Sequence, residues 1–389
     1  AAVLLIQFCH GCSYFEVNTS LGTKVMGHTM EFGTFFGVID WKIAVVPRKA
    51  SLVVSGEETP AVTLRGPFGY VGMGAKSFVA DGMNEKGLII SVQTLYRSDY
   101  KHCNPLSKEY TTIWSAMLPN WILATFSTVA EVKDAINSGK YCIYNPVPGR
   151  SANSHWSIAD AEGNSIVLEY ERGQAKIYEN YVGVMTNDPF YPWQVENINT
   201  YISITSKDAS QKDLRVKTGD QLAGTDEVPK VMGHGFNTFG LPGDPSPPSR
   251  FVKMFFERQI AITNSPPKKK MEDWLTLVQG ILNSIFITKG LTGPDTLGHY
   301  VEGDHTAWAT LRIPKTGFYA VRTYENMRWY TIETRKLDWT KASSHPISHD
   351  IRDGFYDVTN ALLSQSKDPS FLHVKTQGDE ASFLQHEEM

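Results

Sequence analysis

The chain has 389 residues, of which 41% are hydrophobic and 20% charged, as expected for a soluble globular protein with one large domain or two ordinary ones. The formal net charge of -4 gives no electrostatic basis for binding nucleic acid, and no stretch approaches the roughly 20 apolar residues that cross a bilayer. The aromatic content of 12% fits a large core and an apolar pocket, without identifying a ligand.

The first eleven residues resemble the second half of a secretory signal peptide. Residues 1–8 form a short apolar run, and Cys9 and Gly11 place small side chains at the −3 and −1 positions of a cleavage site before Cys12. This pattern predicts a leader or propeptide at 1–11, a secreted or periplasmic protein, and a mature chain that starts at Cys12. A first buried strand is the alternative. Lipid attachment at Cys12 is another, which Cys9 in place of the usual Leu disfavours.

The predicted elements run from strands to helices and back to strands. Residues 12–100 are rich in β-branched residues, and apolar spacings predict a buried helix at 111–124 that Pro119 kinks or splits. This order predicts one α+β domain at residues 12–345 with helices over its sheets, then an extension at 346–389 with a mobile end. The other predictions are a helix at 127–137, strands at 154–160, 165–170 and 176–178, a loop-rich stretch at 188–248, helices at 250–263 and 271–282, and strands at 308–313, 317–323 and 328–333.

Four cysteines, at positions 9, 12, 103 and 142, indicate one disulfide and one free thiol. If Cys9 leaves with the leader, three cysteines remain, and an odd number in an exported protein suggests one pair and one free thiol. A bond between Cys103 and Cys142 would leave Cys12 free. The alternative is that both are small buried residues.

Several common catalytic motifs are absent from the sequence. It contains no Gly-rich phosphate loop, no His-Glu-x-x-His and no Gly-x-Ser-x-Gly elbow. The Cys-x-x-Cys pair of Cys9 and Cys12 would be lost on cleavage, and the histidines show no metal-ligand spacing. We therefore expect neither a metal nor an organic cofactor.

An N-terminal Cys12 would carry two catalytic groups on one residue. Its thiolate is a nucleophile, and its α-amine, with a pKa of about 7.7–8.0 in model peptides, is a general base and then a general acid near neutral pH. Before cleavage the same nitrogen belongs to an amide and is not basic. Removal of the leader would therefore activate the protein.

Short motifs along the chain resemble the choloylglycine hydrolase and penicillin V acylase family. These enzymes are N-terminal-nucleophile hydrolases that act on linear amide C–N bonds, and the resemblance extends in family order from residue 12 to about 340. The motifs are Cys12-Ser13-Tyr14-Phe15, then residues 27–32, 81–88, 183–189, 240–251, 304–308 and 322–324.

The resemblance implies roles for individual residues. Cys12 matches the nucleophile, Asn187 the donor to the developing oxyanion, and Arg250 the arginine that supports the nucleophile. Thr94, or Gln93 beside it, matches a further residue that helps the oxyanion. Outside this family context, Asn187 would be interpreted as a turn residue and Arg250 as a surface cation at a helix start.

Two positions depart from the family pattern. The family usually has arginine sixteen residues after the nucleophile, where this chain has His28, and aspartate nineteen residues after it, where this chain has Glu31. Glu31 keeps a carboxylate that can accept a hydrogen bond from the Cys12 α-amine. His28 lacks the fixed charge and forked donors of arginine, so we expect thiolate stabilisation to depend on pH. The alternative is a strand histidine beside an inert site.

The resemblance also implies a four-layer αββα sandwich of two antiparallel sheets, no cofactor and a homotetramer. The substrate would be a small acyl amide, such as a conjugated bile acid, penicillin V, or an N-acyl lactone or lipid. The alternatives are a ceramidase-like lipid amidase and an inactive, secreted ligand-binding homologue. Loops at 35–39, 96–104 and 190–193 are candidate pocket walls.

Overall fold

The computed structural model describes residues 11–34, 41–55, 61–75, 78–104, 106–146, 153–208, 234–293, 302–348, 350 and 352. Residues 1–10 of the predicted leader, most of the predicted C-terminal extension and the candidate pocket wall at 35–39 lie outside the described residues. No helix in the described ranges is both long and apolar enough to cross a bilayer.

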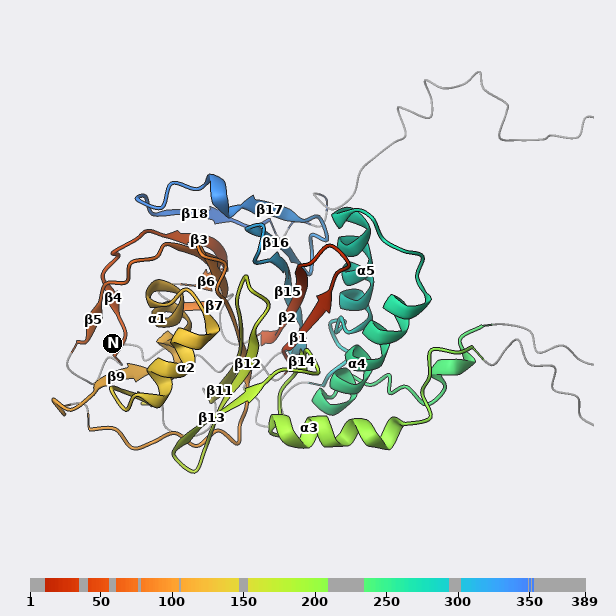
Figure 1. Cartoon of the computed structure of the whole chain (residues 1–389), viewed down its shortest axis with the longest axis horizontal. Helices are drawn as coiled ribbons and strands as arrows, with labels where there is room; N and C mark the ends of the chain where they lie inside the picture. The colour runs from red at the N-terminus through yellow and green to blue at the C-terminus, as the bar shows by residue number, and fades with distance from the viewer. Residues whose placement is uncertain are drawn as a thin grey trace, which may run out of the picture.

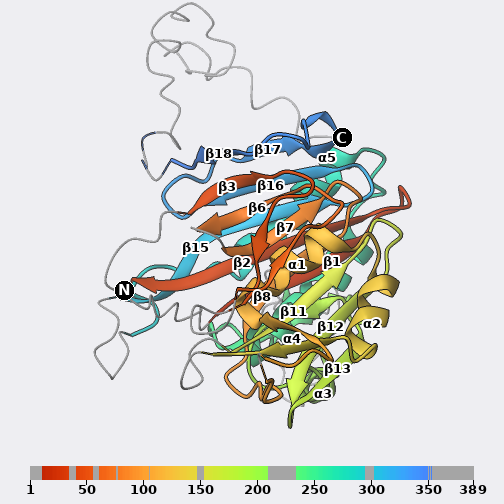
Figure 2. The same cartoon turned by 90° about the vertical axis from the view of Figure 1, so that its left-hand side faces the viewer.

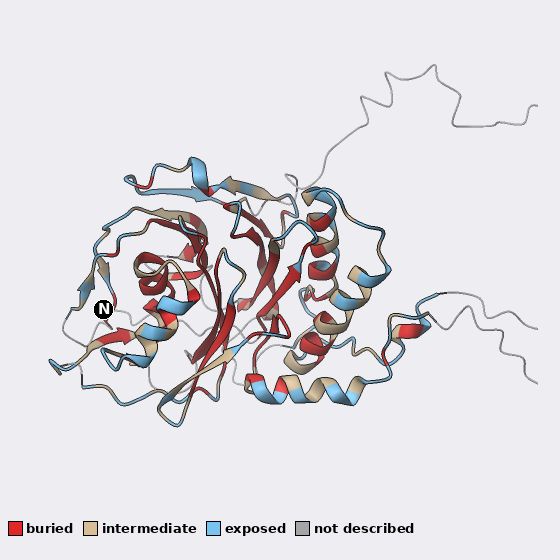
Figure 3. Ribbon diagram, in the orientation of Figure 1, coloured by how far each residue is buried: buried red, intermediate tan, exposed pale blue. Residues whose placement is uncertain are grey.

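Two antiparallel sheets lie face to face between two layers of helices (Figure 1). Helices α1 (Leu118–Thr125) and α2 (Val129–Asn137) cover one sheet, and helices α4 (Pro247–Asn264) and α5 (Met271–Ser284) cover the other. The predicted α+β sandwich of four layers is therefore confirmed. The buried residues concentrate in the two sheets and on the helix faces that contact them (Figure 3).

The sheet beside α4 and α5 has six strands in the order β14-β1-β2-β15-β16-β17. Its central strands β2 and β15 lie side by side, as the turned view shows (Figure 2). The bounds of its strands are β1 Ser13–Asn18, β2 Lys24–Thr34, β14 Val184–Met185, β15 Glu302–Ile313, β16 Phe318–Thr323 and β17 Tyr330–Glu333.

The sheet beside α1 and α2 has eight strands in the order β13-β12-β11-β8-β7-β6-β3-β18. Their bounds are β3 Lys42–Val46, β6 Tyr70–Ala75, β7 Phe78–Asn84, β8 Ile89–Thr94, β11 Ser154–Ala159, β12 Ser165–Glu171, β13 Gln174–Glu179 and β18 Ser343–Pro346. Two small pairs complete the strands: β4 Leu52–Val53 with β5 Thr63–Leu64, and β9 Thr111–Trp114 with β10 Tyr141–Tyr144.

The single helix predicted at 111–124 is wrong in its first third. Residues 111–114 form β9, which pairs in parallel with β10, and α1 begins only at Leu118 after a turn of 3₁₀ helix at Ser115–Met117. Proline is tolerated in the first turn of a helix, so Pro119 fixes where α1 starts. The β-branched run that precedes it is then available to pair as a strand.

Alternation along the strands divides the interior into two cores. On β11, Trp156 and Ile158 pack into the cluster under α1 and α2, whereas Ala159 belongs to the cluster between the two sheets. On β12, Ile166 and Leu168 face the helices and Val167 faces the other sheet. Successive strand residues point to opposite faces, so β11 and β12 each contribute to both cores.

A disulfide joins Cys103 to Cys142, with their Cα atoms 6.0 Å apart. It links the segment after β8 to β10, and the predicted pairing is confirmed. Cys12 remains the free cysteine of the described chain, and it is buried.

Candidate active site

Cys12 lies directly before β1, beside the neighbouring strand β2. The antiparallel register pairs Ser13 with Thr29 and Tyr14 with His28, and the Cys12 Sγ lies 3.5 Å from the Sδ of Met30. This pairing brings the predicted nucleophile to the stretch of β2 that carries both His28 and Glu31. In this chain the Cys12 nitrogen is still part of the peptide bond to Gly11.

Strand alternation sends His28 and Glu31 to opposite faces of the six-stranded sheet. His28 points between the sheets, where its Nδ1 lies 2.9 Å from Asp81 Oδ2 on β7. Glu31 points toward the helix layer, where its Oε1 accepts a 2.8 Å hydrogen bond from Thr306 Oγ1. His28 and Glu31, the two residues that depart from the family pattern, therefore lie on different sides of the sheet beside Cys12.

His28 is wholly buried in a charged environment. Its contact with Asp81 is close enough for an ion pair, although the ring geometry is outside that of a hydrogen bond. Burial disfavours the charged ring, but Asp81 and the Cys12 thiol outweigh it and raise the pKa of His28 above its ordinary value. The site therefore favours an imidazolium beside the thiol, which is the form that stabilises a thiolate.

Asp81 is the centre of a buried network between the sheets. Its carboxylate accepts hydrogen bonds from Arg312, from Ser91 Oγ at 2.8 Å and from Tyr319 OH at 2.8 Å. Burial alone would raise the pKa of Asp81, yet Arg312, His28 and Tyr319 hold it below its ordinary value. Asp81 is thus an anion that orients His28.

Sequence reasoning gave no role to Asp81 or Arg312. Each has apolar neighbours in its strand, with Val79, Ala80 and Met83 around the aspartate and Leu311 and Ile313 around the arginine. Charged side chains are almost never fully buried without a partner, so a charge inside such a run was the available signal. The partner, however, lies 231 positions away in the chain.

Glu31 is buried against Gly11, the last residue of the predicted leader. A Cβ placed on Gly11 would lie 3.1 Å from the Glu31 Cβ, so the residue before Cys12 packs directly on this side chain. Burial, opposed by Arg250 and supported by the charge of Cys12, raises the pKa of Glu31 to about 8. Its Oε2 has no hydrogen-bond partner among the described residues.

Arg250, at the start of α4, joins the predicted nucleophile to the predicted oxyanion donor. Its Nη1 donates to the Cys12 carbonyl at 2.9 Å and to Ser13 Oγ, and its Nη2 donates to Asn187 Oδ1 at 2.9 Å. Its Nε donates to the Pro245 carbonyl at 2.8 Å, which fixes the plane of the guanidinium. Only 2% of Arg250 is exposed, so the alternative interpretation as a surface cation is wrong.

Asn187 lies just beyond β14, where Arg250 orients its side-chain amide. Its Nδ2 donates to the Thr94 carbonyl at 3.0 Å. An amide nitrogen carries two hydrogens, so one remains for an acyl oxygen. Thr94 thus contributes its backbone to this contact, while its hydroxyl and both polar atoms of the neighbouring Gln93 have no hydrogen-bond partner in the described chain.

The structure thus brings all six predicted site residues together. Arg250 links Cys12 to Asn187, and Asn187 contacts Thr94. Of the candidate pocket walls, the segment at 96–104 meets this group through Tyr96, whose backbone N–H donates to Asp188 Oδ2 at 2.8 Å.

The fold is shared with solved hydrolases of amides. A mutant conjugated bile acid hydrolase from Clostridium perfringens superimposes with a TM-score of 0.72 over 87% of this chain and 98% of that chain, at 24% identity. Penicillin V acylase from Agrobacterium tumefaciens gives a TM-score of 0.66 over 85% and 88%, at 21% identity.

Sequence comparison identifies the family. Residues 12–345 match the model of the linear amide C–N hydrolases, choloylglycine hydrolase family. A bile salt hydrolase/transferase of Clostridium perfringens is 29% identical over 84% of this chain and 93% of that protein, and one of Lactiplantibacillus plantarum is 29% identical over 78% and 89%. The chain belongs to this family and is a hydrolase of carbon–nitrogen bonds in linear amides. The ceramidase-like and inactive alternatives gain no support from these matches.

Proposed function

We propose that this enzyme hydrolyses a small acyl amide with Cys12 as its N-terminal nucleophile, after residues 1–11 have been removed. The observation that carries the proposal is the Arg250 guanidinium, which binds both the Cys12 carbonyl and the Asn187 side chain. One buried cation thereby fixes the distance between the attacking residue and the oxyanion donor.

The reaction follows from these positions. The Cys12 thiolate attacks the acyl carbon, and Asn187 Nδ2 and a backbone N–H stabilise the oxyanion. The C–N bond breaks as the Cys12 α-ammonium, formed when the α-amine took the thiol proton, protonates the leaving amine, which leaves a thioester on Cys12. The α-amine then takes a proton from water, the hydroxide attacks the thioester, and the acid is released.

In this proposal Glu31 interacts with the α-ammonium of Cys12, and His28 interacts with its thiolate. Removal of Gly11 would expose the unpartnered Glu31 Oε2 to the new α-ammonium, and the added positive charge would lower the raised pKa of this carboxyl. On the other face, the His28 imidazolium, oriented by Asp81, would stabilise the thiolate.

The substrate class is taken from the relatives. The similar proteins include bile salt hydrolase/transferases and a penicillin V acylase from Pectobacterium atrosepticum, which is 34% identical over 31% of this chain and 33% of that protein. We therefore expect a conjugated bile acid or penicillin V as substrate, ahead of N-acyl lactones and lipids. The disulfide supports an oxidising compartment, in line with a secreted or periplasmic enzyme. The homotetramer remains a prediction, and light scattering would measure the oligomeric state.

Mass spectrometry combined with an activity panel tests the proposal. Intact mass and N-terminal sequencing should show a mature chain that starts at an unmodified Cys12. This protein should release the amine from glycocholate or penicillin V, and Cys12→Ala should lose this activity while its thermal unfolding stays close to that of the parent. A fully active enzyme that retains residues 1–11 would contradict the proposal.

A second test asks whether His28 is an adapted group. Asp81 already pairs with Arg312, so His28→Arg would bury a second fixed cation against the first. We expect kcat/KM to fall about tenfold or more, whereas a rise would show that the histidine is a handicap. The pH profile of kcat/KM should also lose an ionisation in this variant, because arginine does not titrate in this range.

A further inference from the structure

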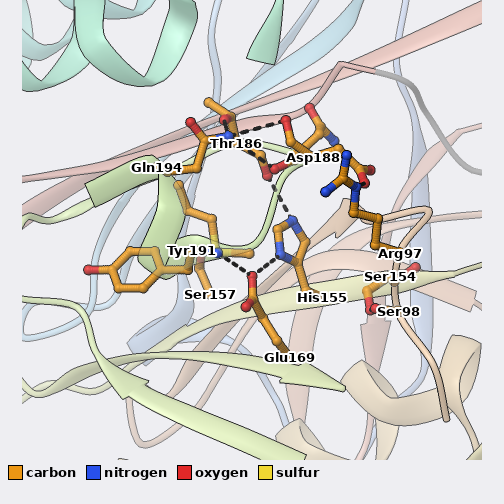
Figure 4. Close-up of polar contacts among 12 residues, drawn as sticks. Arg97, Ser98, Ser154, His155, Ser157, Glu169, Thr186, Asp188, Tyr191 and Gln194 are labelled. Carbon is orange, nitrogen blue, oxygen red and sulfur yellow. Dashed lines mark hydrogen bonds and ion pairs between the residues drawn. The ribbon is translucent and has the colours of Figure 1, made fainter. Parts of the chain in front are cut away.

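A second buried pair of ionisable residues lies on the inner face of the eight-stranded sheet, outside the catalytic group (Figure 4). His155 on β11 and Glu169 on β12 belong to neighbouring antiparallel strands, and their exposed fractions are 1% and 0%. The His155 Nδ1 lies 2.9 Å from Glu169 Oε1. The proposed reaction gives neither residue a role.

The pair reaches both ends of the segment that contains Asn187. On one side, the His155 Nε2 lies 2.9 Å from the Thr186 carbonyl. On the other side, Glu169 Oε1 accepts a 2.9 Å hydrogen bond from the Tyr191 backbone N–H, at the first residue of α3 (Tyr191–Asn197). One ion pair therefore spans the six residues from 186 to 191 (Figure 4).

The two contacts of His155 use different ring nitrogens. A backbone carbonyl only accepts hydrogen bonds, so the Nε2 is the donor to Thr186, and the Nδ1 faces the Glu169 carboxyl group. Loss of either side chain would therefore release one end of the segment.

Other contacts hold the middle of the same segment. The Gln194 Nε2 donates to the backbone carbonyls of Asn187 at 3.3 Å and of Asp188 at 3.2 Å. The Tyr96 N–H donates to Asp188 Oδ2, two residues after the Thr94 carbonyl that binds Asn187. With both its ends and its middle fixed, the segment presents the Asn187 side chain in one orientation.

We propose that His155 and Glu169 are positioning residues that fix Asn187 for the oxyanion, an inference that rests on the proposed role of Asn187. A buried ion pair is costly to desolvate, and apolar residues of similar size would often pack as well. Here the pair supplies two directed contacts to backbone groups on either side of the proposed donor. A misplaced donor would weaken binding of the transition state more than binding of the substrate.

Glu169→Gln tests the pair with little change in volume. The amide keeps an oxygen for the Tyr191 N–H but removes the carboxyl group that faces His155 Nδ1. We expect kcat to fall about tenfold to a hundredfold with KM within about twofold, because the loss lies in the transition state. His155→Gln, which retains one donor, should show the same separation of kcat from KM. Glu169→Asp, which restores the charge, should recover part of the rate.

The matched control is Asp160→Asn. Asp160 is also buried. It follows His155 by five positions, which corresponds to about 17 Å in an extended strand. Its Oδ2 accepts the Val129 N–H at the start of α2, so it is a carboxylate with a structural contact away from Asn187. This variant should lose stability while kcat stays within about twofold. If Asp160→Asn lowered kcat as much as Glu169→Gln, the proposal would be overturned.

A double-mutant cycle with Asn187→Ala separates this proposal from the proposed function. If the pair acts through Asn187, Glu169→Gln should change kcat less than about twofold once Asn187 is alanine. An equal loss in both backgrounds would overturn the positioning role. If Asn187→Ala itself left kcat unchanged, the proposed function of Asn187 would fail instead.

Hydrogen exchange gives a readout without catalysis and serves for any variant that is inactive. In a Cys12→Ala background, Glu169→Gln should raise the exchange rate of the Tyr191 amide and its neighbours about tenfold or more, whereas Asp160→Asn should not. Unchanged exchange at Tyr191 would show that the pair does not hold the segment.

Discussion

The two faces of the eight-stranded sheet are built from the same strands but form different kinds of core. The face under α1 and α2 is almost wholly apolar, with Ile90 on β8, Trp156 on β11 and Leu168 on β12. The residues directly beside these in the sequence, Ser91, His155 and Glu169, are equally buried yet polar. The difference shows that burial alone does not mark the functional side of this sheet.

The inner face tolerates polar groups because they are paired across elements. Asp81 binds Arg312 from the opposite sheet, and Glu169 binds His155 and a backbone amide. The outer face needs no such pairing, since apolar burial and close packing stabilise it. Substitutions on the two faces should therefore have different effects on stability and activity, and two of the four predictions that follow test this contrast directly.

The largest effect should follow Asp81→Asn on the inner face. The change leaves the Arg312 guanidinium buried without its counter-charge, so we expect the free energy of unfolding to drop by about 3–5 kcal/mol. Urea unfolding at neutral pH measures this value. A loss below about 1 kcal/mol would indicate that Ser91 and the Tyr14 ring can hold the cation without the carboxylate.

The second-largest effect should follow Arg250→Lys, which should lower kcat/KM. Lysine cannot reproduce the forked contacts to the Cys12 carbonyl and Asn187, so we expect kcat/KM to fall about a hundredfold or more. Arg258→Lys on the same helix is the control, because Arg258 donates to the carbonyls of Glu16 and Gly183, which we place outside the site. The control should keep activity within about threefold, and equal losses in both variants would assign Arg250 a structural role only.

Adjacent residues on β8 give a direct comparison of the two faces. Ser91→Ala removes hydrogen bonds to Asp81 and from Arg312 and should cost about 1.5–3 kcal/mol, with a shifted pH profile because Asp81 orients His28. Ile90→Val on the outer face should cost about 0.5–1.5 kcal/mol and leave the pH profile unchanged. Thermal unfolding and pH–rate curves measure both. If the two variants had the same stability and the same pH profile, the proposed difference between the two faces would be wrong.

The last prediction concerns the slope of stability against pH in a chain that retains Gly11. Between the ordinary value of 4.5 and the raised pKa of about 8, the folded state keeps a proton on Glu31 that the unfolded state has lost. Stability should therefore fall as pH rises through this window, by up to about 1.4 kcal/mol per pH unit. Glu31→Gln should remove this slope. The same slope in parent and variant would show that Glu31 is not protonated there.

How much the sequence predicts differs between the fold and the site. The order of the predicted strands and helices indicated one α+β domain with helices over its sheets, and the resemblance supplied the αββα arrangement. The helix expected at 111–124 failed because its apolar spacing suits both a helix and a strand. Only the pairing of residues 111–114 with β10 decided between them.

By itself, the sequence determined which residues we propose for the chemistry, because Cys12, Asn187 and Arg250 lie in motifs that the chain carries in family order. The tertiary structure decided how they are supported. Asp81 meets Arg312, and His155 meets Thr186, only because particular strands are neighbours in register. Local patterns encode which face of a strand is buried, whereas partners far apart in the sequence are chosen by the cost of burying an unpaired charge.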